Sequence, residues 1–205
     1  MNTLRDDLRR AYDDDVDRRD AKSLNPWRFD IRNKFFTKLR EHEVQTILEL
    51  GAGTGKDSLF FKEKGLVVKT TDLSPAMVQR CREKGLDAQV GDFYQLDFPD
   101  QAFDAVWAMN CLLHVPKADL PDVLREICRV LKPGGWFYMG VYGGDEEDGV
   151  YEDDFCEPKR WFTRYTDDHL REVVSSVFNL FAFYPIDPQD GGPGHHQSAF
   201  LRAPD

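Results

Sequence analysis

The stretch Thr46-Ile47-Leu48-Glu49-Leu50-Gly51-Ala52-Gly53-Thr54-Gly55-Lys56-Asp57 decides the fold that we expect for this chain. Residues 46–50 are mostly apolar and predict a buried β-strand, residues 51–55 predict a glycine-rich turn, and a helix should follow. Glycine has no Cβ atom, so a ligand can lie against the backbone of such a turn. The helix would present free N–H groups at its start. This order of elements is typical of sites that bind nucleotide-like cofactors.

The spacing of the glycines argues against a dinucleotide cofactor. Counted from Gly51, the fingerprint G-x-G-x-x-G requires its third glycine at position 56, where this chain has Lys56. Glu49 would face the ligand, and a carboxylate there suits a cationic or hydroxyl-bearing group and repels a pyrophosphate. A nicotinamide-dependent oxidoreductase is therefore a disfavoured rival hypothesis.

Length and cysteine content narrow the class further. With 205 residues, of which 41% are hydrophobic, the chain suits one globular domain with a sizeable core. Four cysteines without a CxxC pair suggest neither a zinc knuckle nor a disulfide framework, so we expect reduced thiols and a cytoplasmic location. We find no signal peptide, no run of about 18 apolar residues for a membrane span, and no ligand spacing for a metal.

The charge balance disfavours a nucleic-acid partner. The formal net charge is -10, and the Arg-Arg pairs at 9–10 and 18–19 lie among aspartates. Proteins that bind nucleic acids need a basic face that displaces counterions from phosphates. We therefore expect a small-molecule substrate.

Strand and helix patterns alternate from about residue 44 to 142. The expected strands span 45–50, 66–71, 87–90, 103–109 and 136–142. The expected helices span 55–64, 75–84 and 119–131. Such alternation implies a parallel sheet with right-handed crossovers.

The ends of the chain complete the expected fold. The first 40 residues predict one or two helices, and the C-terminal third predicts a helix near 167–176 followed by apolar runs at 177–184 and 197–201. The linker between these runs is too short for a parallel crossover, so the last strand should be antiparallel. We expect an α/β fold, a Rossmann-like doubly wound sheet of about seven strands, mostly parallel, with helices on both faces.

Acidic residues recur where three neighbouring strands should end. In open α/β sheets, ligands bind beyond the carboxyl ends of the strands, which gathers Glu49, Asp72 and Asp92 at one edge. Asp72 lies about 20 residues after Gly51, and a carboxylate at this spacing can accept hydrogen bonds from the two hydroxyls of a ribose. Turn and capping chemistry is the alternative explanation for Asp72 and Asp92. The residue pair Asn110-Cys111 should end the fourth strand at the same edge.

This set of motifs resembles class I S-adenosylmethionine-dependent methyltransferases, and in particular their small ubiquinone- and menaquinone-biosynthesis branch. The matching segments are ELGAGTG (49–55), TDLSPAM (71–77), GDF (91–93), FDAVWAM (103–109) and LKPGG (131–135). The resemblance is dense over 44–142 and looser elsewhere. It implies S-adenosylmethionine as the cofactor and a single domain over 1–205. Its parts would be an N-terminal helical cap (1–40), a cofactor-binding core (41–142), and a substrate-side segment with the terminal strands (143–205).

The resemblance also implies residue roles at the methionine end of the cofactor. The ammonium and carboxylate would be held by Glu49 and by the backbone of the turn, that is Gly51, Ala52, Gly53 and Gly55. Asn110 and Cys111 would border the sulfonium and the donated methyl group. Tyr12, from the N-terminal helix, would close over the cofactor.

At the nucleoside end, the resemblance implies that Asp72 binds the ribose hydroxyls and that Leu73 flanks the adenine. Asp92 would accept from the adenine amino group, and Phe93 would donate its backbone N–H to the ring. Met77 would pack on the adenine or, alternatively, belong to the core.

Methyl transfer needs a nucleophile in line with the S–CH₃ bond and needs a general base only if that nucleophile is protonated. The candidate bases are His114, His195 and His196. The alternatives are that His114 packs at the start of the next helix and that His195 and His196 form an exposed loop pair.

The segment 143–165 should cover the rim of the site, because the fifth strand also ends there. Its acidic run at 145–157 is either a solvated surface or a gate that favours a cationic substrate. An aromatic wall could be formed by Trp27, Trp161, Phe162 and Tyr165. We therefore expect direct in-line methyl transfer to a small molecule. The alternatives are a non-catalytic S-adenosylmethionine-binding module and a methyltransferase of tRNA or protein.

Overall fold

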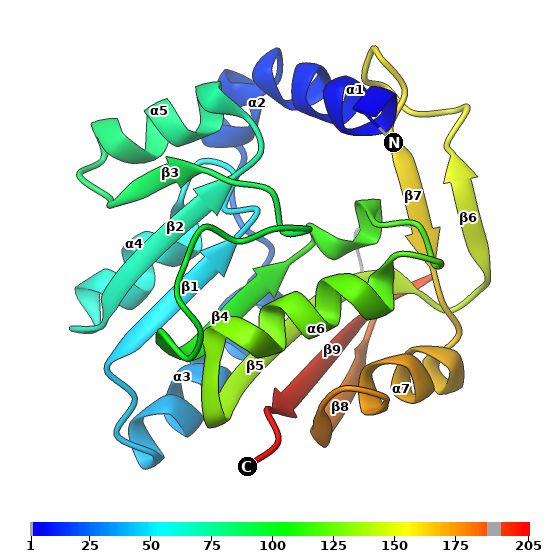
Figure 1. The fold of residues 1–205 in the computed structure, drawn as a ribbon. Coiled ribbons are helices and arrows are strands. Elements are labelled where there is room, and N and C mark those ends of the chain that lie inside the picture. The colour runs from blue at the N-terminus through cyan, green and yellow to red at the C-terminus, as the bar shows by residue number, and fades with distance from the viewer. Residues whose placement is uncertain (1, 188–193) are drawn as a thin grey trace.

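A seven-stranded sheet forms the centre of the computed structural model, which describes residues 2–187 and 194–205 (Figure 1). The strands are β1 (Thr46–Leu50), β2 (Val67–Asp72), β3 (Ala88–Val90), β4 (Phe103–Met109), β5 (Leu131–Gly143), β8 (Asn179–Ile186) and β9 (His195–Arg202). Their order in the sheet is β3-β2-β1-β4-β5-β9-β8. The first five are parallel, and β9 runs antiparallel to both β5 and β8. The predicted fold class is therefore confirmed, although residues 188–193 of the last linker lie outside the described residues.

Helices cover both faces of the sheet because side chains of a strand alternate between its faces. On β1, Ile47 packs with α3 (Pro26–Glu41) and α4 (Lys56–Glu63), whereas Leu48 packs with α6 (Leu120–Val130) and α7 (Asp167–Ser175). The helix α5 (Pro75–Glu83) contacts β2 and β3. Glu49, two residues from Ile47, therefore faces the same side of the sheet as α3 and α4.

Local sequence signals set the ends of these helices. Ser74 caps α5 by accepting from the backbone N–H of Met77 at 3.1 Å. Gly65 and Gly85 follow α4 and α5 with φ values of 90° and 75°, as expected of C-terminal caps. The helix expected over 119–131 is one residue shorter at each end, because Leu131 already belongs to β5.

Three helices, rather than one or two, form the N-terminal region. The helices α1 (Asn2–Asp13) and α2 (Val16–Ala21) lie across the carboxyl ends of the strands, at the top of Figure 1, while α3 packs on the sheet. Polar contacts hold them to α5. Asp13 accepts from the backbone N–H of Ala76 at 3.2 Å, and Arg80 pairs with Asp17 and Asp20 at 2.6 and 2.7 Å.

The segment 143–165 contains a two-stranded antiparallel sheet, formed by β6 (Glu147–Val150) and β7 (Trp161–Arg164). Basic residues engage its acidic run. Arg164 pairs with Asp145 at 2.6 Å, and the buried Arg160 pairs with the buried Asp154 at 2.7 Å. Part of the acidic charge in this segment is thus neutralised within it.

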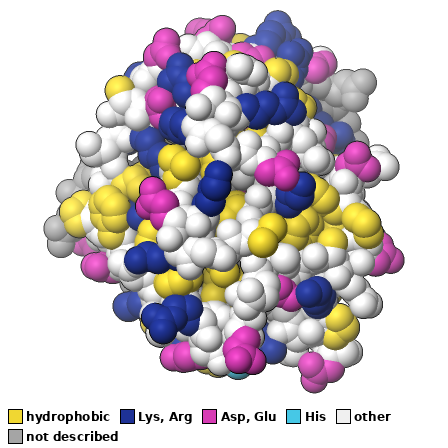
Figure 2. Space-filling view, turned by 90° about the vertical axis from the view of Figure 1, so that its left-hand side faces the viewer, with side chains coloured by type: hydrophobic (Ala, Val, Ile, Leu, Met, Phe, Trp, Pro, Cys, Tyr) yellow, Lys and Arg dark blue, Asp and Glu magenta, His cyan; other side chains and the backbone are white. Residues whose placement is uncertain are grey.

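The surface that Figure 2 shows, on the left-hand side of Figure 1, carries Lys and Arg side chains interspersed with Asp and Glu. Within the described ranges 2–187 and 194–205, no helix has both the length and the apolar character needed to cross a bilayer. Nor do three His, Cys, Asp or Glu side chains come together, among these same residues, in a way that could hold a metal ion.

Candidate active site

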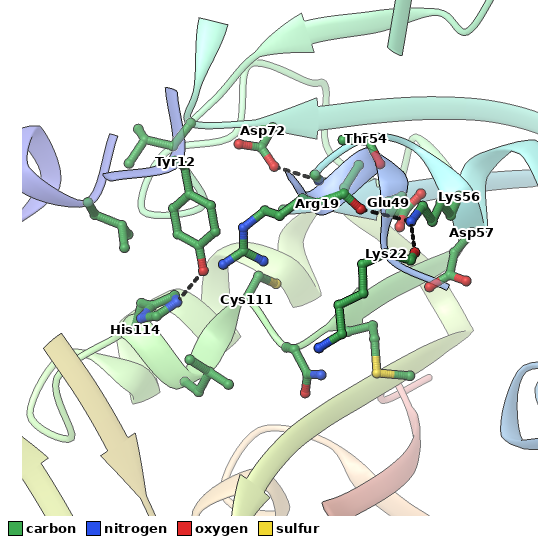
Figure 3. A pocket seen from close by; sticks show the side chains of 18 of the residues that line it. Tyr12, Arg19, Lys22, Glu49, Thr54, Lys56, Asp57, Asp72, Cys111 and His114 are labelled. Carbon is green, nitrogen blue, oxygen red and sulfur yellow. Dashed lines mark hydrogen bonds between the residues drawn. The ribbon is translucent and has the colours of Figure 1, made fainter. Parts of the chain in front are cut away.

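A cavity of about 360 Å³ lies beyond the carboxyl ends of β1, β2 and β4, with residues of α1 and α2 in its wall (Figure 3). Its volume falls within the range of roughly 300–1,000 Å³ that is typical of small-molecule sites. The predicted site residues that line it are Tyr12, Glu49, Gly51, Ala52, Gly53, Asp72, Leu73, Phe93, Asn110, Cys111 and His114. Residues from four elements far apart in the sequence therefore meet in one cavity.

The three glycines of the turn have different physical roles. All have positive φ, 58° at Gly51, 55° at Gly53 and 78° at Gly55, where a side chain is strained. A Cβ at Gly51 would lie 2.3 Å from Cys111 Cβ, and one at Gly55 would lie 2.4 Å from Leu86 Cδ1. A Cβ at Gly53 would meet no atom within 4 Å. Gly51 and Gly55 thus permit close packing, and Gly53 leaves open space beside its backbone.

Asp72 ties the end of β2 to the glycine turn. Its Oδ2 accepts from the backbone N–H of Gly53 at 2.7 Å, and its Oδ1 accepts from that of Ser74 at 2.9 Å. Burial raises the pKa of this carboxyl group to about 6. The capping role is therefore real, but each carboxylate oxygen keeps further acceptor capacity for a ligand hydroxyl.

Glu49 and Asp57 form an acidic pair at the other end of the turn. Ser58 donates its hydroxyl to Glu49, and burial, followed by the charge of Asp57, raises the pKa of Glu49 well above its usual range. Asp57 accepts from Arg28 at 2.9 Å and from Arg32 at 2.8 Å. Two arginines of α3 thus partly balance the negative charge of this acidic pair.

Arg28 is a cavity residue that the sequence did not reveal. It lines the cavity beside Glu49 and Asp57, and its Nε is buried without a hydrogen-bond partner among the described residues. Nothing in the pattern of α3 distinguishes Arg28 from the other basic residues of that helix. Only the packing of α3 against β1 and α4 brings it to the site.

Asp92 lies in a smaller adjoining cavity of about 40 Å³ that shares Leu73 and Phe93 with the main one. Arg5 of α1 donates to Asp92 Oδ2 at 2.8 Å, and the other oxygen accepts from the backbone N–H of Tyr94 at 3.0 Å. Among the predicted site residues, Met77 and Gly55 line neither cavity, and Met77 is fully buried.

Tyr12 and His114 form a hydrogen-bonded pair at the cavity wall (Figure 3). The Nδ1 of His114 lies 2.7 Å from the carbonyl oxygen of Trp161, which can only accept, so Nδ1 carries the proton. The hydroxyl of Tyr12 therefore donates to Nε2 at 2.6 Å. Burial lowers the pKa of His114 to about 3, which keeps the ring neutral. The buried Arg160, also unforeseen, donates to the Tyr12 oxygen at 3.3 Å.

His195 and His196 belong to β9 and not to an exposed loop. They pair with Gly143 and Tyr142 of β5 in the sheet register. His195 Nε2 lies 2.6 Å from Asp167 Oδ1, and His196 is fully buried. Neither residue lines the cavity.

Comparisons with known proteins agree with this geometry. A family model described as a methyltransferase domain matches residues 48–139. The chain is 37% identical over 127 residues to a sterol 24-C-methyltransferase of Aspergillus fumigatus, covering 58% of this chain and 32% of that protein. It is 29% identical over 148 residues to a demethylmenaquinone methyltransferase of Tropheryma whipplei, covering 69% and 54%. The chain thus spans about a third to a half of the length of these relatives.

A solved structure from Pyrococcus horikoshii shares the fold, with a TM-score of 0.69, 20% identity and coverage of 88% of this chain and 92% of that one. The strand order, the glycine turn and the carboxylates at the strand ends define a Rossmann-like cofactor-binding protein. More specifically, residues 48–139 form a methyltransferase domain, of the kind found in class I S-adenosylmethionine-dependent methyltransferases.

Proposed function

We propose that the chain transfers a methyl group from S-adenosylmethionine to a small molecule by direct in-line displacement. One observation carries this proposal: Gly53, Asp72 and Glu49 border the same cavity. An open backbone, a hydroxyl acceptor and a buried acid together suit a nucleoside with a cationic end. When bound, this cofactor supplies a methyl group that its sulfonium already activates for transfer.

At the nucleoside end, Asp72 would accept from the ribose hydroxyls, with Leu73 and Phe93 flanking the adenine. Asp92 would accept from the adenine amino group while it keeps its contact with Arg5. In this arrangement, α1 covers the nucleoside, and Met77 supports the wall from the core behind it.

At the methionine end, the backbone of the turn and Glu49 would hold the ammonium group. Arg28 would pair with the carboxylate, because its buried Nε has no partner among the described residues. Asn110 and Cys111 would border the sulfonium, where β4 ends. In this proposal, residues 41–142 hold the cofactor and residues 1–40 cover it.

The acceptor would occupy the part of the cavity lined by Tyr12, Leu113, Tyr142, Phe155 and Phe162. These side chains offer apolar surface and exclude water, so the acceptor is held in line with the transferable methyl group. The lone pair of the acceptor would form the new bond to carbon while the C–S bond breaks, and its electron pair would stay on the sulfur of the departing S-adenosylhomocysteine. Residues 143–165 contribute aromatic side chains to this wall rather than a cluster of free acids.

The proposal assigns the role of general base to none of the three candidate histidines. The Nε2 of His114 accepts from Tyr12, and its lowered pKa disfavours protonation. His195 and His196 lie outside the lining of the cavity. The acceptor would therefore enter with a free lone pair, as an unprotonated amine, a thiolate, a phenolate or a stabilised carbanion does.

A small acceptor is supported by the cavity and by the relatives, whose names describe methylation of a sterol and of demethylmenaquinone. The interspersed charges of Figure 2 give no sign of a basic face for tRNA on that side. The four cysteines are free thiols, which supports the proposed cytoplasmic location.

The test is a turnover assay that measures release of S-adenosylhomocysteine with a panel of small metabolites. Bulk tRNA and a protein extract serve as parallel acceptors. We expect turnover with at least one small molecule and loss of that turnover in Asp72→Ala. Asp87→Ala, which changes an exposed carboxylate just before β3, should keep full turnover. Release only with tRNA or protein would overturn the proposed substrate class. Binding without turnover of any acceptor would favour the non-catalytic module.

A further inference from the structure

A hydrogen-bonded series of polar side chains runs from the core of the sheet to Asn110 at the cavity, and the proposed mechanism gives its buried members no role. The hydroxyl oxygens of Tyr138 and Ser198 are 3.0 Å apart, and Ser198 Oγ lies 3.1 Å from His196 Nδ1. His196 Nε2 lies 3.2 Å from Asn110 Oδ1. Tyr138, Ser198 and His196 are fully buried, where polar groups are costly unless they are hydrogen-bonded.

The partners define where the protons lie. The Asn110 oxygen can only accept, so His196 Nε2 carries the proton and Nδ1 accepts from the hydroxyl of Ser198. Tyr138 can in turn donate to Ser198; its other acceptor is the weaker Met109 Sδ, at 3.8 Å. Burial lowers the pKa of His196 to about 3, so the ring stays neutral and this tautomer persists.

Of the four side chains in this hydrogen-bonded series, Asn110 is the one that lines the cavity. Its φ of 57° is in the left-handed region, which Asn tolerates better than most residues but which is strained. Its backbone N–H donates to the Gly140 carbonyl at 2.7 Å, and its side-chain oxygen accepts from His196. The side-chain NH₂ group is thus the hydrogen-bond donor of Asn110 that is left for a ligand.

The surroundings of His196 hold its ring in place. The ring of Trp27 lies against it, with centroids 4.3 Å apart and planes inclined by 41°. A Cβ at Gly140 would lie 2.9 Å from His196 Cε1, so the glycine provides the room that the imidazole occupies. A buried, neutral and closely packed imidazole is poorly suited to take up a proton. It is well suited to hold the neighbouring Asn110 side chain in one orientation.

We infer that His196 is a positioning residue that orients the Asn110 amide so that its NH₂ group donates to the methyl acceptor. An acceptor matched to this donor carries a carbonyl or ionised oxygen at or beside its nucleophilic atom. The inference rests on the proposed function, and it assigns to His196 a role other than that of a base. It also explains why an Asn at a strained backbone position follows β4, where it would lie next to the transferable methyl group.

The first experiment needs no acceptor. Nitrogen-15 NMR of the histidine rings in the full chain should show His196 as the neutral Nε2–H tautomer from about pH 5 to about pH 8. An Nδ1–H tautomer, or a ring that titrates in this range, would overturn the inference. Because this result does not depend on turnover, it is separable from failure of the proposed function.

The second experiment uses variants and the acceptor that the metabolite panel identifies. His196→Leu should lower kcat/KM for the acceptor by about tenfold or more, while the Kd of S-adenosylhomocysteine changes by less than about twofold. His196→Gln, whose amide can still donate to Asn110, should recover most of the loss. In an Asn110→Asp background, His196→Leu should add little. Equal effects of Leu and Gln, or a parallel loss of cofactor affinity, would instead indicate a purely structural role.

Discussion

Asp72 shows how one side chain can serve both the fold and a ligand. It caps the residues after β2, holds the glycine turn through Gly53, and still lines the cavity. The two explanations weighed for its sequence position, capping and ligand binding, are therefore compatible. A carboxylate with two oxygens can satisfy two backbone N–H groups and keep lone pairs for hydroxyls.

We predict that Asp72→Ala weakens binding of S-adenosylhomocysteine by about 1–3 kcal/mol, the cost of leaving buried hydroxyls without a partner. Titration calorimetry measures this change, and thermal unfolding shows whether the variant is folded. Asp87→Ala, an exposed carboxylate paired with Lys69, is the matched control and should bind normally. Unchanged affinity in a folded Asp72→Ala would refute the ribose role.

The affinity for the cofactor product should also depend on pH. Burial raises the pKa of Asp72 to about 6, and only the carboxylate form can accept from two hydroxyls. Affinity should be constant above about pH 7 and should fall as pH decreases through about 6, approaching tenfold per unit. Calorimetry across this range tests the sign. A flat profile, or tighter binding in acid, would contradict the role of the Asp72 carboxylate.

Residues near the strand ends could be predicted because the family motifs are local in sequence. Glu49 lies one residue before the end of β1 and Asp72 ends β2, and the apolar pattern reveals both strands. Arg28 and Arg160 could not be predicted, because each reaches the cavity from an element placed only by long-range packing. His196 could be named from the sequence as a candidate base, but its hydrogen-bond partners Asn110 and Ser198 come from the tertiary fold.

At the scale of elements, a buried ion pair joins α3 to the sheet. Asp57 of α4 accepts from Arg32 of α3 at 2.8 Å and from the indole N–H of Trp107 on β4 at 3.1 Å. Both charged side chains are more than nine-tenths buried. Removing Arg32 would leave the buried Asp57 with Arg28, at 2.9 Å, as its remaining cationic partner.

We predict that Arg32→Ala lowers the free energy of unfolding by about 1.5–3 kcal/mol, the range for a hydrogen bond to a charged group, as measured by urea denaturation. Lys38→Ala removes an exposed pair with Glu41 on the same helix and should lower it by less than about 1 kcal/mol. If Arg32→Ala were no more destabilising than Lys38→Ala, Asp57 would have another means of compensation, and this account of the α3 contact would be wrong.

Elements with a clear period were predictable, and those that depend on partners were not. The strands and helices of 45–142 follow from apolar patterns and from caps such as Ser74. The pair β6 and β7 lies in an acidic segment without such a pattern, and it is held by contacts such as that of Thr163 Oγ1 with the Val115 carbonyl at 2.7 Å. The separation of α1 from α2 occurs in a run of aspartates that also gave no clear boundary.

For the whole molecule, the net charge does not indicate which charged residues line the cavity. The chain carries a formal net charge of -10. Its cavity is nevertheless lined by six basic residues, Arg18, Arg19, Lys22, Arg28, Lys56 and Arg160. Several of them have partners within the chain; Lys56, for example, donates to the Arg19 carbonyl at 2.8 Å. The fold thus concentrates basic groups at an edge that the sequence composition conceals.

The central claim is that this cavity binds a sulfonium nucleoside and not a dinucleotide. Titration calorimetry of the full chain with S-adenosylmethionine and, separately, with NADH tests it most directly. We predict saturable binding of S-adenosylmethionine at one site per chain and no measurable heat with NADH. Binding of NADH without binding of S-adenosylmethionine would contradict the account.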